Sequence, residues 1–331
     1  MTTRSQPTKT DSSRHLITTI SPSAVPDVAD HHQGSAGGDV VRLRFDAAYD
    51  GTDFFGWAAQ PGLRTVAGVL TEALSLMFGP AGTRGLTVAG RTDAGVHATG
   101  QVCHLDVAAD RWAELANTLP RRLAGLLPAD LRVSRITPVR ETFDARFSAL
   151  FRRYAYRVSD APWGAPALRH RDTLAWPHPL DLDLLNAASA PLQGEHDFAA
   201  YCRRKEHATT IRAITKLYWH REPDGIVVAT VQADAFCQAM VRSLVGALLS
   251  VGSGRRPLEW PASLLERRER ASDVGVAAAH GLTLTAVGYP DDPADYPRRA
   301  ELTRALRAPR IRPTGRGGPP DRIQGFSPPI R

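Results

Sequence analysis

The sequence predicts an α+β fold, or a mixed sheet, from three kinds of pattern. Segments in which apolar and polar residues alternate recur along the chain and indicate half-buried strands. Segments with apolar residues three or four positions apart lie between them and indicate amphipathic helices. Two expected strands, at 211–220 and 226–231, are separated by Pro223-Asp224-Gly225, which is typical of a hairpin turn. Strands joined both by helices and by hairpins are characteristic of this fold class.

The first expected elements are a strand and a helix. Val41, Leu43 and Phe45 alternate with charged residues, so one face of this strand is expected to be buried. Thr65 is a suitable N-cap for the helix, because its hydroxyl can accept a hydrogen bond from a backbone N–H group of the first turn. The apolar face of that helix comprises Val66, Val69, Leu70, Ala73, Leu74 and Met77.

The next part of the chain is expected to contain a glycine-rich loop and an interrupted helix. Strands at 86–89 and 101–107 flank the loop. The helix, over 111–126, is interrupted or restarted at Pro120, because proline lacks the N–H group that a helix interior uses. A strand at 131–139 follows.

The second half of the chain begins with a strand at 151–158. Arg152, Tyr154 and Tyr156 share one of its faces, because side chains alternate along a strand. The later elements, besides the hairpin, are a helix and a last strand, expected at 238–251 and 282–287.

Both ends of the chain differ in composition from the middle. Residues 1–39 are rich in Ser, Thr, Pro and Asp without periodicity, and are expected to form a disordered arm. Residues 298–331 contain nine arginines and supply a net charge of +7. They are expected to form a mobile tail that either contacts RNA through its charge or only keeps the protein soluble. Residues 40–297 carry a net charge of +1, so charge alone does not identify a nucleic-acid partner.

The composition excludes several classes of protein. With 43% hydrophobic and 23% charged residues among 331, the chain has the composition of a globular protein. The longest apolar stretch, at 244–251, is too short to span a bilayer, and no secretory signal is visible near Met1. The three cysteines, Cys103, Cys202 and Cys237, are far apart in the sequence. We therefore expect free thiols in a reducing cytoplasm, and neither a disulfide framework nor a structural zinc site.

Residues 90–97, Gly-Arg-Thr-Asp-Ala-Gly-Val-His, form the segment best suited to chemistry. Their glycine spacing matches a phosphate-binding loop, but Lys and then Ser or Thr do not follow, so that interpretation fails. The sequence contains no Gly-x-Gly-x-x-Gly for a dinucleotide and no metal-ligand spacing. Asp93 is a candidate nucleophile, because Arg91 favours its ionised form. An Asx-turn aspartate beside a structural or phosphate-binding arginine is the alternative.

This loop and a set of further motifs resemble the tRNA pseudouridine synthase A family. Residues 90–97 match its active-site signature, and the other motifs follow in the expected order over residues 41–290. The resemblance depends on all of these motifs occurring in the same order, and no single motif after the signature would establish it. Those motifs are Tyr49-Asp50-Gly51-Thr52, Gly56-Trp57, Gly100-Gln101-Val102, Leu126-Leu127-Pro128, Asp144-Ala145-Arg146-Phe147-Ser148-Ala149, Arg153-Tyr154-Ala155-Tyr156, Gly194-Glu195-His196-Asp197-Phe198, Met240-Val241-Arg242 with Val245-Gly246, and Gly281-Leu282.

The resemblance implies a fold, a reaction and a partner. The pseudouridine synthase fold has two similar lobes, here 40–150 with the Asp93 loop and 151–297, which share a central antiparallel sheet covered by helices. The active cleft lies between the lobes. The implied reaction is the isomerisation of uridine to pseudouridine at positions 38–40 of tRNA, on the 3′ side of the anticodon loop and its stem. The family further implies a cytoplasmic homodimer that binds tRNA across both subunits and uses no cofactor or metal.

The resemblance also implies roles for five residues. Asp93 is the essential catalytic group, and Tyr154 stacks on the uracil that is flipped out of the RNA. Arg91 occupies the vacated space or holds Asp93 before RNA arrives. Arg242 points toward the catalytic carboxylate, and Leu282 packs under the tyrosine. From the residues alone, Tyr154 and Leu282 are equally compatible with a plain core, and Arg242 with an exposed helix face.

Basic residues outside this group are candidate contacts to tRNA phosphates. They form two sets of three residues, and each set is also compatible with a surface that only contacts solvent. His97, in the signature, either contacts RNA or only braces the loop. The two sets are Arg203, Arg204 and Lys205, and Arg152, Arg153 and Arg157.

Five positions depart from the family pattern, namely Ala58, Ala67, Ala124, Cys237 and Gln238. None of them replaces a residue with an implied catalytic role, so they bear on RNA contacts and target position. Two other functions stay open. One is a non-catalytic tRNA binder or chaperone on the same fold. The other is a related synthase that acts on another RNA or another uridine.

Overall fold

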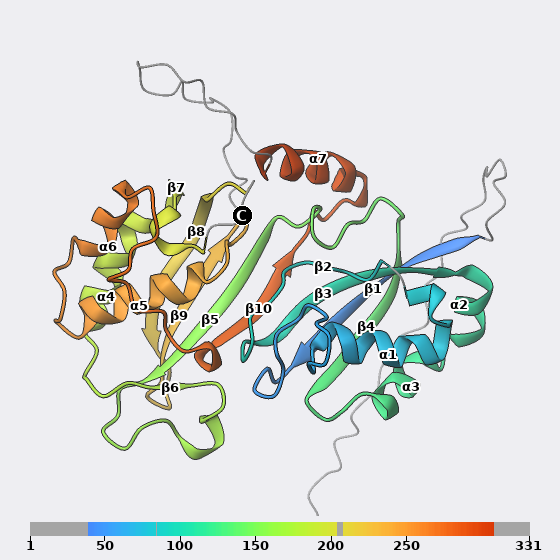
Figure 1. Ribbon diagram of the computed structural model, residues 1–331, viewed down its shortest axis with the longest axis horizontal. Helices are drawn as coiled ribbons and strands as arrows, with labels where there is room; N and C mark the ends of the chain where they lie inside the picture. The colour runs from blue at the N-terminus through green and yellow to red at the C-terminus, as the bar shows by residue number, and fades with distance from the viewer. Residues whose placement is uncertain (1–38, 84, 204–207, 308–331) are drawn as a thin grey trace, which may run out of the picture. The chain divides into compact units, whose positions relative to one another are not determined.

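The computed structural model describes residues 39–83, 85–203 and 208–307, so most of the two predicted arms lies outside the described residues. Within these ranges ten strands form one sheet (Figure 1). Their order is β4-β1-β3-β10-β5-β9-β8-β7, with β2 paired to β3 and β6 paired to β5. The strands are β1 (Val40–Tyr49), β2 (Thr87–Val88), β3 (His97–Ala108), β4 (Leu131–Val139), β5 (Phe151–Ser159), β6 (Leu174–Ala175), β7 (Gly194–Asp197), β8 (Ile211–Arg221), β9 (Val227–Ala233) and β10 (Leu282–Gly288).

The sheet is mixed. Most neighbouring strands are antiparallel, including the predicted hairpin of β8 and β9. Strand β10 runs parallel to β3, with Thr283 opposite His97 and Leu284 opposite Ala98, and β6 runs parallel to β5. Strand β10 comes after α5 and α6 in the chain and enters the sheet between β3 and β5. The α+β class is confirmed, whereas the expectation of an antiparallel central sheet holds only on either side of the β3–β10 pair.

Seven helices belong to the described residues, and their ends follow local sequence signals. The Thr65 side chain accepts a hydrogen bond from the backbone N–H of Gly68 (3.2 Å), which confirms the predicted N-cap. The helix expected over 111–126 is divided in two, and its second part restarts just before Pro120, as predicted. The helices are α1 (Val66–Phe78), α2 (Ala109–Leu115), α3 (Leu119–Leu126), α4 (Leu182–Ser189), α5 (Met240–Gly252), α6 (Trp260–Ser263) and α7 (Tyr296–Arg307).

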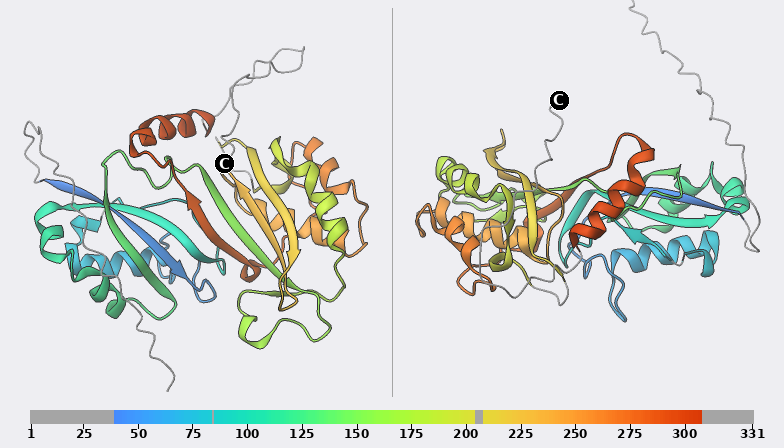
Figure 2. Two further views of the ribbon diagram at one scale, coloured as in Figure 1. Left: turned by 180° about the vertical axis from the view of Figure 1, so that it is seen from behind. Right: turned by 90° about the horizontal axis from the view of Figure 1, so that it is seen from above.

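One large apolar core lies between the sheet and the helices on one of its faces. Leu43 and Phe45 of β1 and Leu70 and Leu74 of α1 are fully buried in it. Helix α5 is buried over most of its surface and contributes to the same core. Figure 2 (right) shows α1 and α5 on the same side of the sheet. Each fully buried Leu or Phe side chain contributes about 1.5–3 kcal/mol, so this core holds the two halves of the sheet together.

The first part of the predicted mobile tail is helical. Residues from 298 were expected to lack regular structure, but Tyr296–Arg307 forms helix α7, beyond the ends of β5 and β10 (Figure 1). Tyr296 packs against Phe143, with ring centroids 5.3 Å apart, in a small separate core. The Arg299 side chain donates a hydrogen bond to the Ala149 carbonyl (3.2 Å). These contacts stabilise the helix against the rest of the protein. Its arginine-rich sequence gave no indication of them.

Candidate active site

Residues 90–96, the predicted reactive loop, connect β2 to β3 and are held by the segment that follows β1. The Trp57 amide donates to the Thr92 carbonyl (3.1 Å), and the Gly95 amide donates to the Phe54 carbonyl (3.2 Å). Gly95 has a φ of +76°, a conformation that glycine adopts without a steric penalty. The loop therefore presents Asp93 from a backbone that is fixed on both sides.

A buried network of hydroxyl and amide groups supports the same loop from beneath. The Gln101 amide donates to the Gly90 carbonyl (2.8 Å) and to the Tyr49 hydroxyl (3.2 Å). The Tyr49 hydroxyl lies 2.8 Å from the Thr92 hydroxyl. Since Gln101 donates to Tyr49, the Tyr49 proton is free to point at Thr92. Burial raises the pKa of Tyr49 to about 12, so this network keeps its proton at neutral pH.

The close approach between Gly51 and the end of the loop leads to a prediction. A Cβ atom at Gly51 would lie 2.1 Å from the Val96 carbonyl oxygen, which is backbone and cannot move aside cheaply. We expect Gly51→Ala to destabilise the protein by about 1–3 kcal/mol. Gly125→Ala is the control, because a Cβ there meets nothing within 4 Å. Thermal unfolding of both variants checks this; equal melting temperatures would contradict it.

His97 braces the loop rather than facing a cavity. Its Nδ1 atom accepts a hydrogen bond from the Gly51 amide (2.9 Å), and its Nε2 atom lies 2.8 Å from the Arg171 carbonyl. The side chain is buried, with 6% of the residue exposed. Both ring nitrogens are thus engaged by backbone groups, which favours the bracing role over RNA contact.

A cavity of about 1310 Å³ opens beside the loop and brings together residues that are far apart in the sequence. It is lined by both halves of the chain. Six of the predicted site residues contribute to it, together with Arg152, a further predicted phosphate contact. His97 does not line it, and Arg204 and Lys205 lie outside the described residues. The six are Arg91, Asp93, Tyr154, Arg203, Arg242 and Leu282.

Helix α5 places Arg242 next to the loop. The Arg242 Nη1 atom lies 3.9 Å from Oδ2 of Asp93, and its Nε donates to the Ala277 carbonyl (2.7 Å). The residue before the helix, Ala239, has a φ of +65°. This turn sets the direction in which α5 leaves the cavity wall. Both charged side chains stay partly exposed, so solvent weakens the pair and leaves Asp93 accessible.

Tyr154 lies in the wall of the cavity, on the face of β5 predicted from the alternation of that strand. Only 7% of the residue is exposed. Its ring packs edge-to-face against Phe236, with centroids 5.2 Å apart and an interplanar angle of 84°. Burial raises the pKa of the Tyr154 hydroxyl above its usual range. Leu282, at the start of β10, is 5% exposed and lines the same cavity.

The charge of the cavity is strongly positive. Among the described residues, six arginines line it against one carboxylate, that of Asp93. The sequence patterns did not single out Arg146, Arg212 or Phe236 as site residues. Arg146 could have been found from its place in the Asp-Ala-Arg-Phe motif, whereas Arg212 and Phe236 gave no local signal. The six arginines are Arg91, Arg146, Arg152, Arg203, Arg212 and Arg242.

Arg152 lines the cavity but is occupied by the fold. Its guanidinium donates to the carbonyls of Ala89 (2.7 and 3.2 Å), Asp234 (2.9 Å) and Arg146 (2.5 Å). Only 4% of the residue is exposed. These bonds tie together three segments behind the loop, which favours a structural role for Arg152 over the predicted phosphate contact. Arg153 and Arg157, predicted with it, do not line the cavity.

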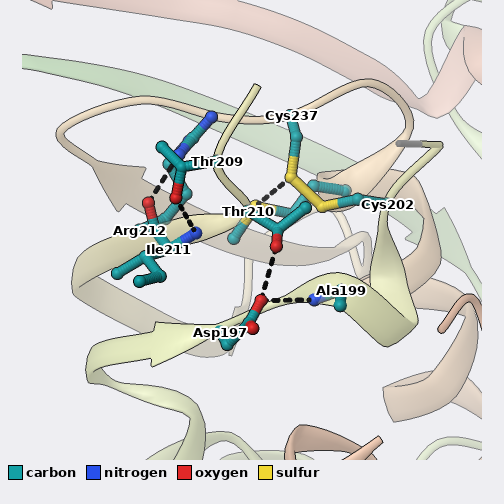
Figure 3. Close-up of a disulfide and its surroundings, with 9 residues drawn as sticks. Asp197, Ala199, Cys202, Thr209, Thr210, Ile211, Arg212 and Cys237 are labelled. Atoms are coloured by element: carbon teal, nitrogen blue, oxygen red, sulfur yellow. Dashed lines mark hydrogen bonds between the residues drawn. A yellow bond between two sulfur atoms is a disulfide. The ribbon is translucent and has the colours of Figure 1, made fainter. Parts of the chain in front are cut away.

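The structure corrects the expectation for the cysteines. Cys202 and Cys237 form a disulfide, with Cα atoms 5.7 Å apart (Figure 3), so the prediction that all three thiols are free was wrong. The two lie 35 positions apart in the sequence. Tertiary pairing brings them together, because the Arg203 amide donates to the Gln238 carbonyl (3.0 Å) directly beside the two sulfur atoms. Cys237 also lines the cavity, so the bond lies in its wall.

Thiol titration tests this pairing. We expect the unfolded, unreduced protein to react at one thiol, Cys103, and the reduced protein at three. In the folded state Cys103 should be unreactive, because burial raises the pKa of its thiol and keeps it protonated. Three reactive thiols in the unfolded protein without reductant would show that Cys202 and Cys237 are not joined.

Neither a membrane helix nor a metal cluster is found in the described part of the chain. None of its helices combines the length and apolar character needed to cross a bilayer. Within the same residues, no three His, Cys, Asp or Glu side chains come together as a metal site.

Comparison with known proteins identifies the family. Residues 188–290 match the family described as tRNA pseudouridine synthase. The tRNA pseudouridine synthase A of Frankia casuarinae is 56% identical over 270 residues, which cover 82% of this chain and 97% of that protein. The corresponding proteins of Streptomyces griseus and Mycobacterium leprae are 54% identical over 262 residues (79% of this chain, 92% of the relative) and 49% identical over 279 residues (81% and 96%). The chain therefore belongs to the tRNA pseudouridine synthase A family, a family of isomerases.

Proposed function

We propose that this protein converts uridine to pseudouridine at positions 38–40 of tRNA, with Asp93 as the nucleophile. The observation that carries the proposal is the cavity, in which one carboxylate lies among six arginines and a buried tyrosine. Its volume of about 1310 Å³ exceeds that of a typical small-molecule pocket, as a flipped nucleotide with its flanking phosphates requires.

The reaction itself explains why one carboxylate is enough. The bond between uracil N1 and ribose C1′ breaks, and a bond between uracil C5 and C1′ forms. A proton leaves C5 and a proton is taken up at N1, so the product is an isomer of the substrate. The Asp93 carboxylate either adds to the uracil ring or attacks C1′, and it is released when the new bond is complete. The uracil must stay in the cavity while it rotates.

The neighbouring side chains have complementary roles in this proposal. Arg242, whose Nη1 atom lies 3.9 Å from the Asp93 carboxylate, orients the nucleophile. Tyr154 offers the face on which the uracil stacks, and Leu282 closes the apolar side of the cavity. Arg91 is exposed beside Asp93, where it can occupy the space that the flipped base leaves in the RNA.

The proposal includes the assembly and its setting. The family resemblance supports a cytoplasmic homodimer that binds one tRNA across both subunits. Light scattering on the purified protein, alone and with tRNA, tests the dimer. A monomer under both conditions would remove it from the proposal without affecting the chemistry at Asp93.

Mapping of the product tests the target position. Unmodified tRNA transcripts carrying uridines at positions 38–40 would be incubated with the protein, and pseudouridine would be located by carbodiimide labelling and primer extension. A matched transcript carries cytidines at these positions, with compensating guanosines in the stem. We expect product in the first transcript and none in the second. Product at another uridine would favour the related synthase, and tRNA binding without any product would favour the non-catalytic binder.

A further inference from the structure

Arg212, near the start of β8, is a buried cation whose charge the described protein leaves without a partner. Only 8% of the residue is exposed. Its Nη1 atom donates to the carbonyl of its own neighbour, Ile211 (Figure 3), while its Nε atom is buried and has no hydrogen-bond partner among the described residues. Burial lowers the pKa of this guanidinium from its usual value. A buried charge in this state is costly unless something pairs with it.

Among the described residues, the two carboxylates that act on Arg212 are engaged by other groups. The Asp197 carboxylate accepts hydrogen bonds from the Thr210 hydroxyl (2.5 Å) and the Ala199 amide (3.2 Å), as Figure 3 shows. The Asp234 carboxylate accepts from the Ala213 amide (3.0 Å). Neither lies within 4.0 Å of the Arg212 guanidinium as an ion pair, although both act on it at longer range. Glu195 lies with Arg212 around a separate void of about 30 Å³, which has room for about one water molecule.

Arg212 opens onto the cavity that contains Asp93. The hydroxyl-bearing residues Thr209 and Thr210 line the cavity beside it, and Arg203 extends the same positive wall. Arg152 provides the contrast within this wall, because its guanidinium is saturated by backbone carbonyls and Arg212's is not. A guanidinium that is not saturated by the protein and lines a positive cavity is suited to bind an anion. Its planar array of N–H donors matches the oxygens of a phosphate.

We propose that Arg212 is an RNA-binding residue that holds one phosphodiester group of the strand entering this cavity. The proposal rests on the proposed function, since it takes RNA as the molecule that fills the cavity. The phosphate supplies the negative charge that the described residues do not, and its oxygens accept hydrogen bonds from the part of the guanidinium that faces the cavity. Because the contact lies in the cavity of Asp93, it positions the strand close to the target nucleotide.

The test compares Arg212→Gln with Arg157→Gln. Arg157 is a matched control, because its Nε atom is also buried without a hydrogen-bond partner among the described residues. It lies outside the cavity and 3.9 Å from the Asp172 carboxylate, so the structure does not favour the tRNA contact that the sequence suggested for it. Affinity for an unmodified tRNA transcript would be measured by fluorescence anisotropy at several potassium chloride concentrations. For Arg212→Gln we expect affinity to fall roughly 10- to 100-fold at low salt, and the slope of log affinity against log salt to lose about 1. For Arg157→Gln we expect the wild-type slope.

Two further readouts separate binding from structure. Arg212→Gln should raise KM for tRNA with little change in kcat, and its melting temperature should be unchanged or higher, because an unpaired buried charge has been removed. Arg212→Met, which keeps an unbranched side chain but removes the charge and every polar atom, is the second variant if Arg212→Gln folds poorly. An unchanged salt slope in a folded variant would overturn the proposal, and so would failure of both variants to fold, since Arg212 would then be structural. If the wild type neither binds nor converts tRNA, the proposed function itself fails; if the wild type does both and the Arg212→Gln slope is unchanged, only this inference fails.

Discussion

Asp93→Asn is expected to abolish pseudouridine formation, with a loss on the order of 10⁴-fold or more. The amide has almost the same shape as the carboxylate but cannot form the bond to the uracil ring or to C1′ that the reaction needs. Among the described residues no second carboxylate lines the cavity and could replace it. Binding of tRNA should persist or become tighter, because a negative charge next to the RNA phosphates is removed.

Release of tritium from tRNA labelled at uracil C5 measures this loss directly, since the C5 proton must leave when the new bond forms. Asp53→Asn is the control, because Asp53 is exposed on the segment that holds the loop and does not line the cavity. It should retain wild-type turnover. Appreciable tritium release by Asp93→Asn, or loss of release by both variants, would remove Asp93 from its assigned role.

Tyr154→Ala is expected to give the second largest loss. Stacking of a base on an aromatic ring is worth about 1–3 kcal/mol, or roughly 5- to 160-fold in the stability of the flipped state. The ring is buried against Phe236, so its removal also destabilises the fold, by about 3–5 kcal/mol. Single-turnover rates at saturating enzyme, corrected for the folded fraction, separate the two effects.

Tyr154→Phe distinguishes the ring from the hydroxyl. The raised pKa of the Tyr154 hydroxyl keeps it protonated at neutral pH, so it cannot act there as a ready-made base. We therefore expect Tyr154→Phe to lie within a few-fold of the wild type. Wild-type turnover by Tyr154→Ala would exclude Tyr154 from the site. If Tyr154→Phe were as inactive as Tyr154→Ala, the hydroxyl rather than the ring would be the important group.

Local patterns predicted most of the secondary structure because its causes are local. Alternation placed Leu43 and Phe45 on the buried face of β1, and a capping hydroxyl placed the start of α1 at Thr65. Helix α7 was missed for a related reason. Its apolar contacts come from segments more than a hundred residues earlier, such as Phe143, and a run of arginines hid its single buried face.

The candidate site was predictable only as a set of separate motifs. Asp93 stands out because a short loop between strands carries it, and the ordered motifs indicate the family that the comparisons confirm. The roles proposed for Asp93, Tyr154 and Arg242 stay predictions until the variants are measured. What joins these residues is the arrangement of β3, β5, β10 and α5 around one cavity, and no local pattern encodes that arrangement.

Arg152 and Arg212 show the limit of the sequence most clearly. Both are arginines on sheet strands, yet backbone carbonyls saturate Arg152, whereas the Nε atom of Arg212 has no hydrogen-bond partner in the part of the chain that the structure describes. Cys202 and Cys237 were expected to be free, because their spacing in the sequence does not show that they meet in the fold. The backbone pairing of Arg203 with Gln238, the residues that follow them, brings the two cysteines together. By itself the sequence determined the fold class and the family, and it singled out the loop that carries Asp93, because these depend on neighbouring residues and on their order. Only the tertiary structure decided which arginines are free to bind an anion and which cysteines meet, because burial and hydrogen-bond saturation depend on contacts between distant segments.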